Sequence, residues 1–372
     1  MAWLEGSTRM SPWGYLWWSP SAAARLARAV LAPASWGYGL GVRLRNALYD
    51  SGRLRVHRVG VPVVAVGNIR VGGTGKTPFV IWLVGRLRER GKRVVIVARG
   101  VGGDRPAVLV PPRVAIPAGE DWIVAERWWE SQRLPADEAI LLCLRTATPV
   151  VTDPDRVRGC RRAIAAFAPD LIVLDDGFQH RRLARELDIV LLDSNDRRAR
   201  MLPAGPLREP PSALARADIV VECRGAAVEP SLVRRPVGLV RGPERIEVDE
   251  PISALAGRRV FAFAGIARPE SFFSALEQAG ATIVGHRRFA DHYRYRERDW
   301  LEIRRRAAGA QWIVTTEKDA VKLMPFASGD DRFMVLRIAA DVEPGDQILE
   351  RVCQLDAPRR GHHDRPAESS GE

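Results

Sequence analysis

Short apolar runs alternate with amphipathic stretches through the middle of the chain. Residues 76–90 place Val80, Leu83, Val84 and Leu87 on one helical face, and Gly91 follows as a helix end. Runs that are apolar throughout are typical of parallel strands covered on both faces. They occur at 61–67, 93–100, 170–177, 187–193 and 217–222. This alternation predicts an α/β fold whose main domain is a doubly wound, mostly parallel sheet.

A second set of strands and helices begins after residue 250. The runs "RRVFAFAGI", "TIVGHRRF", "QWIVTT" and "FMVLRI" predict a second, smaller α/β domain. The segment before them, 237–250, has short alternating runs and no core-like element, so we expect a linker there. The predicted organisation is therefore N-terminal helices at 1–50, a core domain at 51–236, the linker at 237–250, the smaller domain at 251–356 and a polar, disordered tail at 357–372.

The first fifty residues are rich in aromatic side chains. "SPWGYLWWSP" brings three tryptophans together at 11–20, and further along Leu40, Leu44 and Leu48 share a helical face while Arg43 and Arg45 lie off it. Tryptophans beside arginine-bearing amphipathic helices are typical of a segment that lies in a membrane interface. A helix packed on the protein's own core would give the same pattern, so both interpretations stay open at this point.

Composition narrows the class of protein. The chain has 372 residues, of which 46% are hydrophobic and 27% charged, as in a globular protein of two domains. Its formal net charge of +12 favours an anionic partner without choosing among nucleic acid, membrane surface and phosphorylated ligand. The four cysteines are scattered, which argues against a disulfide framework or a structural zinc site. With no signal peptide and no run of 18 apolar residues, we expect the chain to stay on the cytoplasmic side.

A glycine-rich loop follows the first of the apolar runs. In "VGNIRVGGTGKTP" the end of the G-x-x-x-x-G-K-[ST] pattern is matched, although its first glycine is replaced by Arg70. A strand before the loop and a helix after it are what a phosphate-binding loop requires. We expect nucleotide contacts from Arg70, Val71, Gly72, Gly73, Thr74, Gly75, Lys76 and Thr77. Lys76 would reach the β and γ phosphates, and the Thr77 hydroxyl would hold Mg²⁺.

A second acidic motif supports the same chemistry. "LIVLDD" ends an apolar strand in Asp175 and Asp176, as a Walker B strand does, and such carboxylates bind Mg²⁺ directly or through water. Loop and strand together predict a site for a nucleoside triphosphate. They do not choose between a switch, a motor and a small-molecule kinase.

Four longer strings carry a family resemblance: "VGNIRVGGTGKTP", "LDDGFQHRRLARELDIVLLD", "LPAGPLREP" and "DHYRY". In this order, over residues from about 36 to about 340, the chain closely resembles tetraacyldisaccharide 4'-kinases. The resemblance implies a P-loop kinase that uses ATP and Mg²⁺ to phosphorylate the 4'-hydroxyl of an acylated glucosamine disaccharide 1-phosphate in lipid A biosynthesis. It also implies a peripheral protein on the cytoplasmic face of the bacterial inner membrane, with a smaller α/β domain joined by a two-stranded linker. We expect a monomer that meets an anionic membrane surface and no nucleic acid.

The resemblance also implies roles for single residues. Asp137 in "LPADEAILL" corresponds to the general base on the sugar hydroxyl, and His292 in "DHYRY" would pair with it across the cleft. The remaining assignments are Glu138 as a further metal ligand and Gln179, His180, Arg156 and Arg208 as substrate-binding residues. Without the family match, Asp137 could be an ordinary helix N-terminal carboxylate and His292 a surface residue.

Three positions depart from the family pattern. Arg70 stands where Ser or Thr is usual and could contact a phosphate or point to solvent; Val101 stands where a tyrosine is usual; and the acidic pair lies in "ADEA" where Gly-Asp-Glu-Pro is usual. Two further interpretations remain beside the kinase. One is a P-loop NTPase switch or metal chaperone without a lipid substrate, and the other is a nucleic-acid-binding ATPase suggested by the charge.

Overall fold

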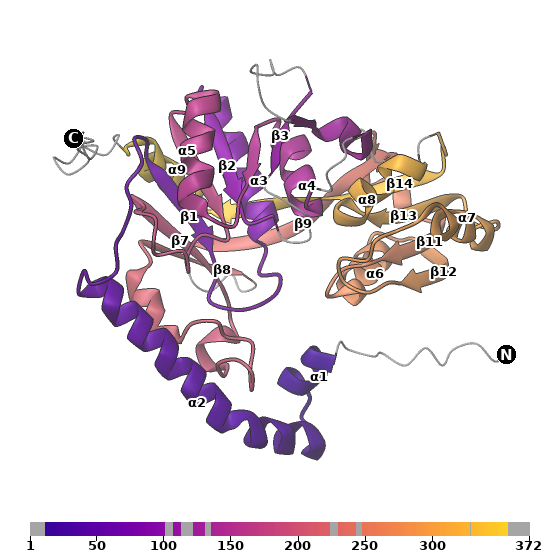
Figure 1. Ribbon diagram of the computed structural model, residues 1–372. Coiled ribbons are helices and arrows are strands. Elements are labelled where there is room, and N and C mark those ends of the chain that lie inside the picture. Colours follow the sequence, from indigo (N-terminus) through magenta and orange to yellow (C-terminus); the bar gives the residue numbers. More distant parts are fainter. Residues whose placement is uncertain are drawn as a thin grey trace, which may run out of the picture.

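The computed structural model describes residues 12–100, 107–112, 122–130, 135–223, 230–242, 248–327 and 329–355. Their strands join in one continuous 14-stranded sheet, which runs through both halves of the molecule (Figure 1). Along the sheet the order is β12-β11-β13-β14-β9-β8-β7-β1-β6-β2-β5-β3-β4, and β10 pairs with β9. The α/β class predicted from the alternating pattern is confirmed.

The larger half is built on six parallel strands, β8-β7-β1-β6-β2-β5. In chain order they are β1 (Val63–Gly67), β2 (Val94–Ala98), β5 (Val150–Thr152), β6 (Leu171–Asp175), β7 (Leu187–Asp193) and β8 (Ile219–Cys223). Beyond β5 lie β3 (Ala107–Val110), which pairs with it antiparallel, and β4 (Trp122–Val124).

Helices cover both faces of this half. One face packs against α3 (Lys76–Glu89) and α4 (Asp137–Thr146), and the other packs against α5 (Arg156–Phe167). In β1, Val64 and Val66 belong to the first layer and Val63 and Ala65 to the second, so successive side chains point to opposite layers. Burial on both sides is the reason that the strand is apolar throughout. The doubly wound arrangement is thus present as predicted.

The smaller half repeats the design with three parallel strands, β12 (Thr282–Arg288), β11 (Arg259–Ala264) and β13 (Trp312–Thr316). Helix α6 (Pro269–Gln278) covers one face, while α7 (Glu297–Arg306) and α8 (Glu317–Ala327) cover the other. Short 3₁₀ turns complete the described elements: η1 (Ala125–Glu130), η2 (Asp196–Arg198), η3 (Pro211–Arg216) and η4 (Ile252–Leu255).

Two long antiparallel strands join the halves: β9 (Ser231–Arg241) and β14 (Phe333–Glu343), with β10 (Glu250–Pro251) beside β9. The segment expected as a linker at 237–250 therefore begins inside a strand, in which Leu239 and Val240 are buried. The chain end differs from the expected domain too. Helix α9 (Gly345–Cys353) packs into the same core as α3 of the larger half, because Ile348, Leu349 and Val352 are apolar on one side.

The N-terminal helices α1 (Pro12–Trp18) and α2 (Ala22–Asp50) lie along one side of the larger half (Figure 1). The side chain of Ser21 caps α2 by accepting from the Ala24 amide at 3.2 Å. Hydrogen bonds tie this pair to residues 201–208: Trp17 Nε1 donates to the Pro203 carbonyl at 3.0 Å, and Ser35 Oγ to the Met201 carbonyl at 3.1 Å. One face of α2 therefore packs on the protein, as one of the two sequence interpretations had it.

The opposite face of α2 is apolar and bare. Its exposed side chains are Leu26, Val30, Trp36, Leu40 and Leu44, with relative exposures of 60 to 75%. Among the helices of the described residues, none combines the length and apolar composition that crossing a bilayer requires.

A buried carboxylate fastens the two halves together. Glu317, at the start of α8, pairs with Arg145 of α4 and with Arg337 of β14, whose Nε lies 3.0 Å from Oε1. Its Oε2 accepts from the Ile338 amide at 3.2 Å. All three side chains are at most 13% exposed, so each charge depends on the others for solvation.

Replacing Glu317 tests how much this carboxylate contributes to the free energy of unfolding. We expect Glu317→Gln to lower the free energy of unfolding by about 3–5 kcal/mol, because two buried guanidinium groups lose their counter-ion. Chemical denaturation followed by circular dichroism measures this. The matched control is Glu270→Gln, whose half-exposed pair with Arg288 should contribute less than about 1 kcal/mol. Equal effects of the two substitutions would contradict the interpretation.

Candidate active site

The glycine-rich loop runs from the carboxyl end of β1 to the start of α3. At its base Gly67 must be glycine, since a Cβ there would lie 2.6 Å from Cβ of Phe178. Gly72 and Gly75 adopt φ of +100° and +96°, which favour glycine. The buried Asn68 braces the loop from within, because its Nδ2 donates to the Gly72 carbonyl at 3.3 Å and to Thr74 Oγ1 at 2.9 Å. Lys76 and Thr77 then open the helix, as the phosphate-loop interpretation predicts.

Arg70 is engaged behind the loop. Only 4% exposed, it places NH1 3.0 Å from Oδ1 of Asp196 and 3.7 Å from Oδ2 of Asp193. Its guanidinium also lies over the ring of Trp18, 5.2 Å from the centroid. The suggestion that this arginine points to solvent is therefore wrong. Its charge is matched by buried carboxylates, so the side chain fastens the loop to the protein and is directed away from a bound phosphate.

The adjacent carboxylates at the end of β6 have opposite environments. Asp176 accepts from Arg208 NH1 and NH2, both at 2.8 Å, and lies 3.3 Å from Lys76 Nζ. Burial alone would raise its pKa, but these cations outweigh burial and hold the pKa well below its usual range. Burial, with the negative charges of Glu138 and Asp176 nearby, raises the pKa of Asp175 to about 7. Oδ1 of Asp175 is buried and accepts no hydrogen bond from the described residues.

The predicted base and its histidine meet across the two halves. Asp137 begins α4, and its Oδ2 lies 3.2 Å from Nδ1 of His292, which comes from the loop between β12 and α7. Although burial opposes it, the contacts with His292 and Lys318 lower the pKa of Asp137. The hydrogen bond with Asp137 raises the pKa of His292. The charge of Glu138, which follows Asp137, contributes to the raised pKa of Asp175, so the start of α4 faces the carboxyl end of β6.

The four predicted substrate residues fall into two groups. Gln179 and Arg208 bond to Asn68 in the loop: Gln179 Nε2 donates to its carbonyl at 2.7 Å, and Arg208 NH2 donates to its Oδ1. Arg156 and His180 keep buried polar atoms, Nε and Nε2, without a hydrogen bond from the described residues. Burial and the charge of Arg156 lower the pKa of His180 to about 4, so this imidazole is neutral at physiological pH. Val101, the second departure noted in the sequence, lies outside the described residues.

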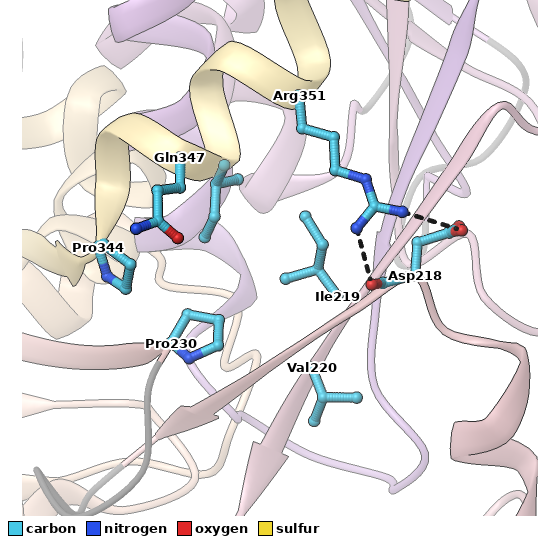
Figure 2. Close-up of a pocket in the computed structure, with 8 residues that line it drawn as sticks. Asp218, Ile219, Val220, Pro230, Pro344, Gln347 and Arg351 are labelled. Carbon is cyan, nitrogen blue, oxygen red and sulfur yellow. Dashed lines mark hydrogen bonds and ion pairs between the residues drawn. The ribbon is translucent and has the colours of Figure 1, made fainter.

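A cavity elsewhere in the protein contains none of these residues. It has a volume of about 460 Å³ between β8 and α9, where Arg351 pairs with Asp218 (Figure 2). Asp218 precedes β8, whereas the phosphate loop follows β1, which runs parallel to it within the sheet. The cavity therefore opens at the edge of the sheet opposite the predicted site.

Comparison with known proteins decides the family. The Tetraacyldisaccharide-1-P 4'-kinase family profile matches residues 27–354. The chain belongs to this family. Among its relatives, tetraacyldisaccharide 4'-kinase of Anaeromyxobacter dehalogenans (strain 2CP-C) is 38% identical over 364 residues, covering 90% of this chain and 93% of the relative. The same enzyme of Geobacter sulfurreducens is 42% identical over 318 residues, covering 81% and 86%.

A solved structure is similar over nearly the same length. The LpxK protein of Aquifex aeolicus, crystallised in complex with ATP, matches with a TM-score of 0.70 and 32% identity, covering 88% of this chain and 98% of that one. This kinase family acts on a hydroxyl group, so membership identifies the chain as a phosphotransferase with an alcohol acceptor.

The sequence patterns did not predict that Lys318 of this kinase lies in the site. Its Nζ lies 3.1 Å from His292 Nε2, 3.3 Å from Glu138 Oε1 and 3.6 Å from Asp291 Oδ1. The available signal was the string "TTEKD", in which charged residues follow directly after a buried strand. That string predicts residues at a sheet edge but not which groups they meet, since the partners come from α4 and a distant loop.

The pKa of Asp175 predicts a pH-dependent stability difference. Its folded value of about 7 exceeds the unfolded value of about 3.9, so the contribution of this carboxyl to stability falls as pH rises from about 4 to about 7. We expect Asp175→Asn to match the unliganded wild type near pH 4. It should exceed the wild type at pH 8 by on the order of 1–3 kcal/mol in free energy of unfolding. Denaturation at several pH values measures this, and a difference independent of pH would contradict the assignment.

Proposed function

We propose that the protein transfers the γ-phosphoryl group of ATP to the 4'-hydroxyl of a tetraacylated glucosamine disaccharide 1-phosphate, a step of lipid A biosynthesis. The observation that carries this proposal is the Asp137–His292 pair beside a phosphate-binding loop, at 3.2 Å between carboxylate and imidazole. An NTPase that only switches state has no need of a general base aimed at an alcohol. The family membership and the similarity to a kinase crystallised with ATP support the same assignment.

The chemistry follows from the charges of the site. Asp137 is ionised at neutral pH because its pKa is lowered, so it can accept the proton of the acceptor hydroxyl. The hydroxyl oxygen forms a bond to the γ-phosphorus as the bond to the ADP oxygen breaks. Lys76, now 3.3 Å from Asp176, supplies positive charge where the transferred group develops negative charge. Arg208 keeps the end of β6 against the loop by bonding to both Asp176 and Asn68.

The residues present fit a magnesium ion bound with the nucleotide. The test is Asp175, whose buried Oδ1 accepts no hydrogen bond from the described residues and whose pKa is raised to about 7. In the described part of the chain no three His, Cys, Asp or Glu side chains form a cage for a metal. Mg²⁺ needs none, because it keeps waters and phosphate oxygens as ligands beside one or two carboxylates. Asp175, Thr77 and Glu138 would hold it, and it would neutralise charge on the phosphates. Asp176 already accepts two hydrogen bonds from Arg208 and lies 3.3 Å from Lys76 Nζ, so its charge is matched within the protein.

Phosphate transfer tests the reaction. We expect purified protein to move radiolabelled phosphate from ATP to the acylated disaccharide monophosphate, and Lys76→Ala to lose most of this activity. Asp137→Asn should lower kcat by about 10²–10⁴-fold while ATP binding stays near normal, because only proton acceptance is removed. ATP hydrolysis that ignores the disaccharide would instead support the NTPase switch. Transfer at the wild-type rate by Asp137→Asn would remove this residue as the base.

We further propose that the protein is peripheral to the cytoplasmic face of the inner membrane, with the bare apolar face of α2 in the interface. An acylated substrate stays in its leaflet, since each CH₂ buried there contributes ~0.8 kcal/mol. A kinase for its sugar must therefore work at the surface. Arg25 and Arg43 of α2, both exposed, suit the anionic lipids of that surface.

Vesicle binding tests this surface. The triple variant Leu26→Ser, Leu40→Ser and Leu44→Ser should bind anionic phospholipid vesicles at least about tenfold more weakly, because three apolar contacts are lost. The matched control is Leu301→Ser with Val284→Ser, which alters exposed apolar side chains of α7 and β12. Co-sedimentation measures both proteins. Equal binding by the triple variant and the control would mean that another surface holds the membrane.

A further inference from the structure

Lys318 lies at the centre of the charged groups around His292. The charged residues that act on this imidazole come from three elements: Asp137 from α4, Asp291 from its own loop and Lys318 from α8. Behind them, Glu138 of α4 contacts Lys318, and Lys322 of α8 acts on Asp137. Lys318 Nζ is 3.1 Å from Nε2, while Asp137 Oδ2 is 3.2 Å from Nδ1. The imidazole is thus held at both nitrogens, by a cation on one side and an anion on the other.

The chemistry of these partners determines the position of the imidazole proton. An ammonium group has three donors and no acceptor, so Nε2 must accept from Lys318 and cannot carry a proton. An ionised carboxylate only accepts, so Nδ1 must carry the proton and donate to Asp137. Each contact requires the same tautomer, with hydrogen on Nδ1. In the opposite tautomer, the hydrogen on Nε2 would face the Lys318 ammonium, which is also a donor. The bare Nδ1 would face the Asp137 carboxylate, which is also an acceptor.

Neighbouring contacts fix the position of Lys318. The residue before it, Glu317, is held by Arg145 and Arg337, which fastens the start of α8 against α4. The Lys318 side chain is only 19% exposed, and its ammonium is held by Glu138 and Asp291 as well as by the imidazole. A group held in this way has little freedom to release Nε2.

We propose that Lys318 is a positioning residue of the phosphotransfer site: its ammonium donates to Nε2 of His292 and fixes the tautomer that donates from Nδ1 to Asp137. This role rests on the proposed function of Asp137 as the general base. The Nδ1–H bond holds the carboxylate plane, so that a free lone pair of Asp137 stays directed at the acceptor hydroxyl. Without Lys318 the imidazole can turn or change tautomer, and the carboxylate loses its orienting donor.

Side-chain ¹⁵N spectra test the first half of the proposal without any substrate. The protein has six histidines, and the signals lost in His292→Gln identify those of His292. Above the pKa of His292, which the hydrogen bond with Asp137 raises, we expect the wild type to show a protonated Nδ1 and an unprotonated Nε2 for this residue. Lys318→Met keeps most of the side-chain length without the charge and should convert His292 to a mixture of tautomers, whereas Lys318→Arg should restore Nδ1–H. A wild-type His292 protonated on Nε2 overturns the proposal, and so does an unchanged tautomer in Lys318→Met.

Steady-state kinetics test the second half. Lys318→Met should lower kcat for phosphate transfer at least about tenfold, with the KM for ATP changed less than about threefold, because only orientation of the base is lost. Lys318→Arg should recover much of kcat. The control Lys92→Met changes a lysine in the turn between α3 and β2, remote from the site, and should match the wild type. A normal kcat in a Lys318→Met protein with altered His292 spectra overturns the positioning role.

These outcomes separate this proposal from that for Asp137. If Asp137→Asn transfers phosphate normally, the proposed base is wrong whatever the spectra show. Suppose instead that Asp137→Asn is impaired and that His292 keeps its tautomer in Lys318→Met. The assignment of Asp137 as base is then supported, and the Lys318 proposal fails. If Lys318→Met does not fold, the wild-type tautomer and the Lys318→Arg kinetics still decide the question.

Discussion

The packing of α4 against α8 is the contact on which the site depends. Helix α4 belongs to the larger half and α8 to the smaller. Two ion pairs join opposite ends of α4 to the first turn of α8: Arg145 meets Glu317, and Glu138 meets Lys318. Asp137 and His292 are 155 residues apart in the chain and come within hydrogen-bond distance only because these helices are held together. The contact between the proposed base and its orienting imidazole therefore exists only while the two halves are packed together. A change that loosened this joint would disturb proton acceptance while leaving the phosphate loop intact, because the loop is braced within the larger half alone.

The two adjacent carboxylates beside the phosphate loop differ in how well their charge is matched. Lys76 and Arg208 both contact Asp176, which leaves the neighbouring Asp175 without a cationic partner at hydrogen-bond distance among the described residues. A buried carboxyl in this state costs stability, which is why its pKa is raised to about 7. Such a group fits a site that binds a cation together with a nucleotide, since the ligand restores the missing charge. If Asp175 holds the cation as proposed, the cost of burying this carboxyl in the unliganded protein and its contribution to binding have the same physical origin.

The sequence predicted best what is local in the chain. The strand, the glycine loop and the helix from Val63 to Glu89 are contiguous, so their pattern determined both the fold and the chemistry there. Contacts of Arg70 with Asp196 and of Lys318 with His292 were not predicted, because they depend on how separate elements pack. The end of strand β9 was taken for a linker because the runs in 237–250 are short and alternating and show no core-like element; Pro236 and Gly238 are also unusual inside a sheet. The structure accommodates Pro236 beside a register shift between Arg337 and Ile338 of β14, which no pattern in β9 itself reveals.

Helix α2 packs one side on the protein and leaves the other exposed, so the membrane interpretation of its sequence pattern stays a prediction. Leucine at every fourth position favoured either a core contact or a membrane face, and apolar side chains on two sides of a helix are compatible with both. Its inner side reaches the site, where Tyr38 donates to the Arg208 carbonyl at 3.0 Å and Arg45 to the Gln179 carbonyl at 2.9 Å. Its outer side exposes Leu40 and Leu44. An α-helix with its side chains is about 10 Å across. If the outer face rests in the membrane interface as proposed, the backbone of two predicted substrate residues lies about one helix diameter from the lipid, within reach of a sugar whose acyl chains never leave the leaflet.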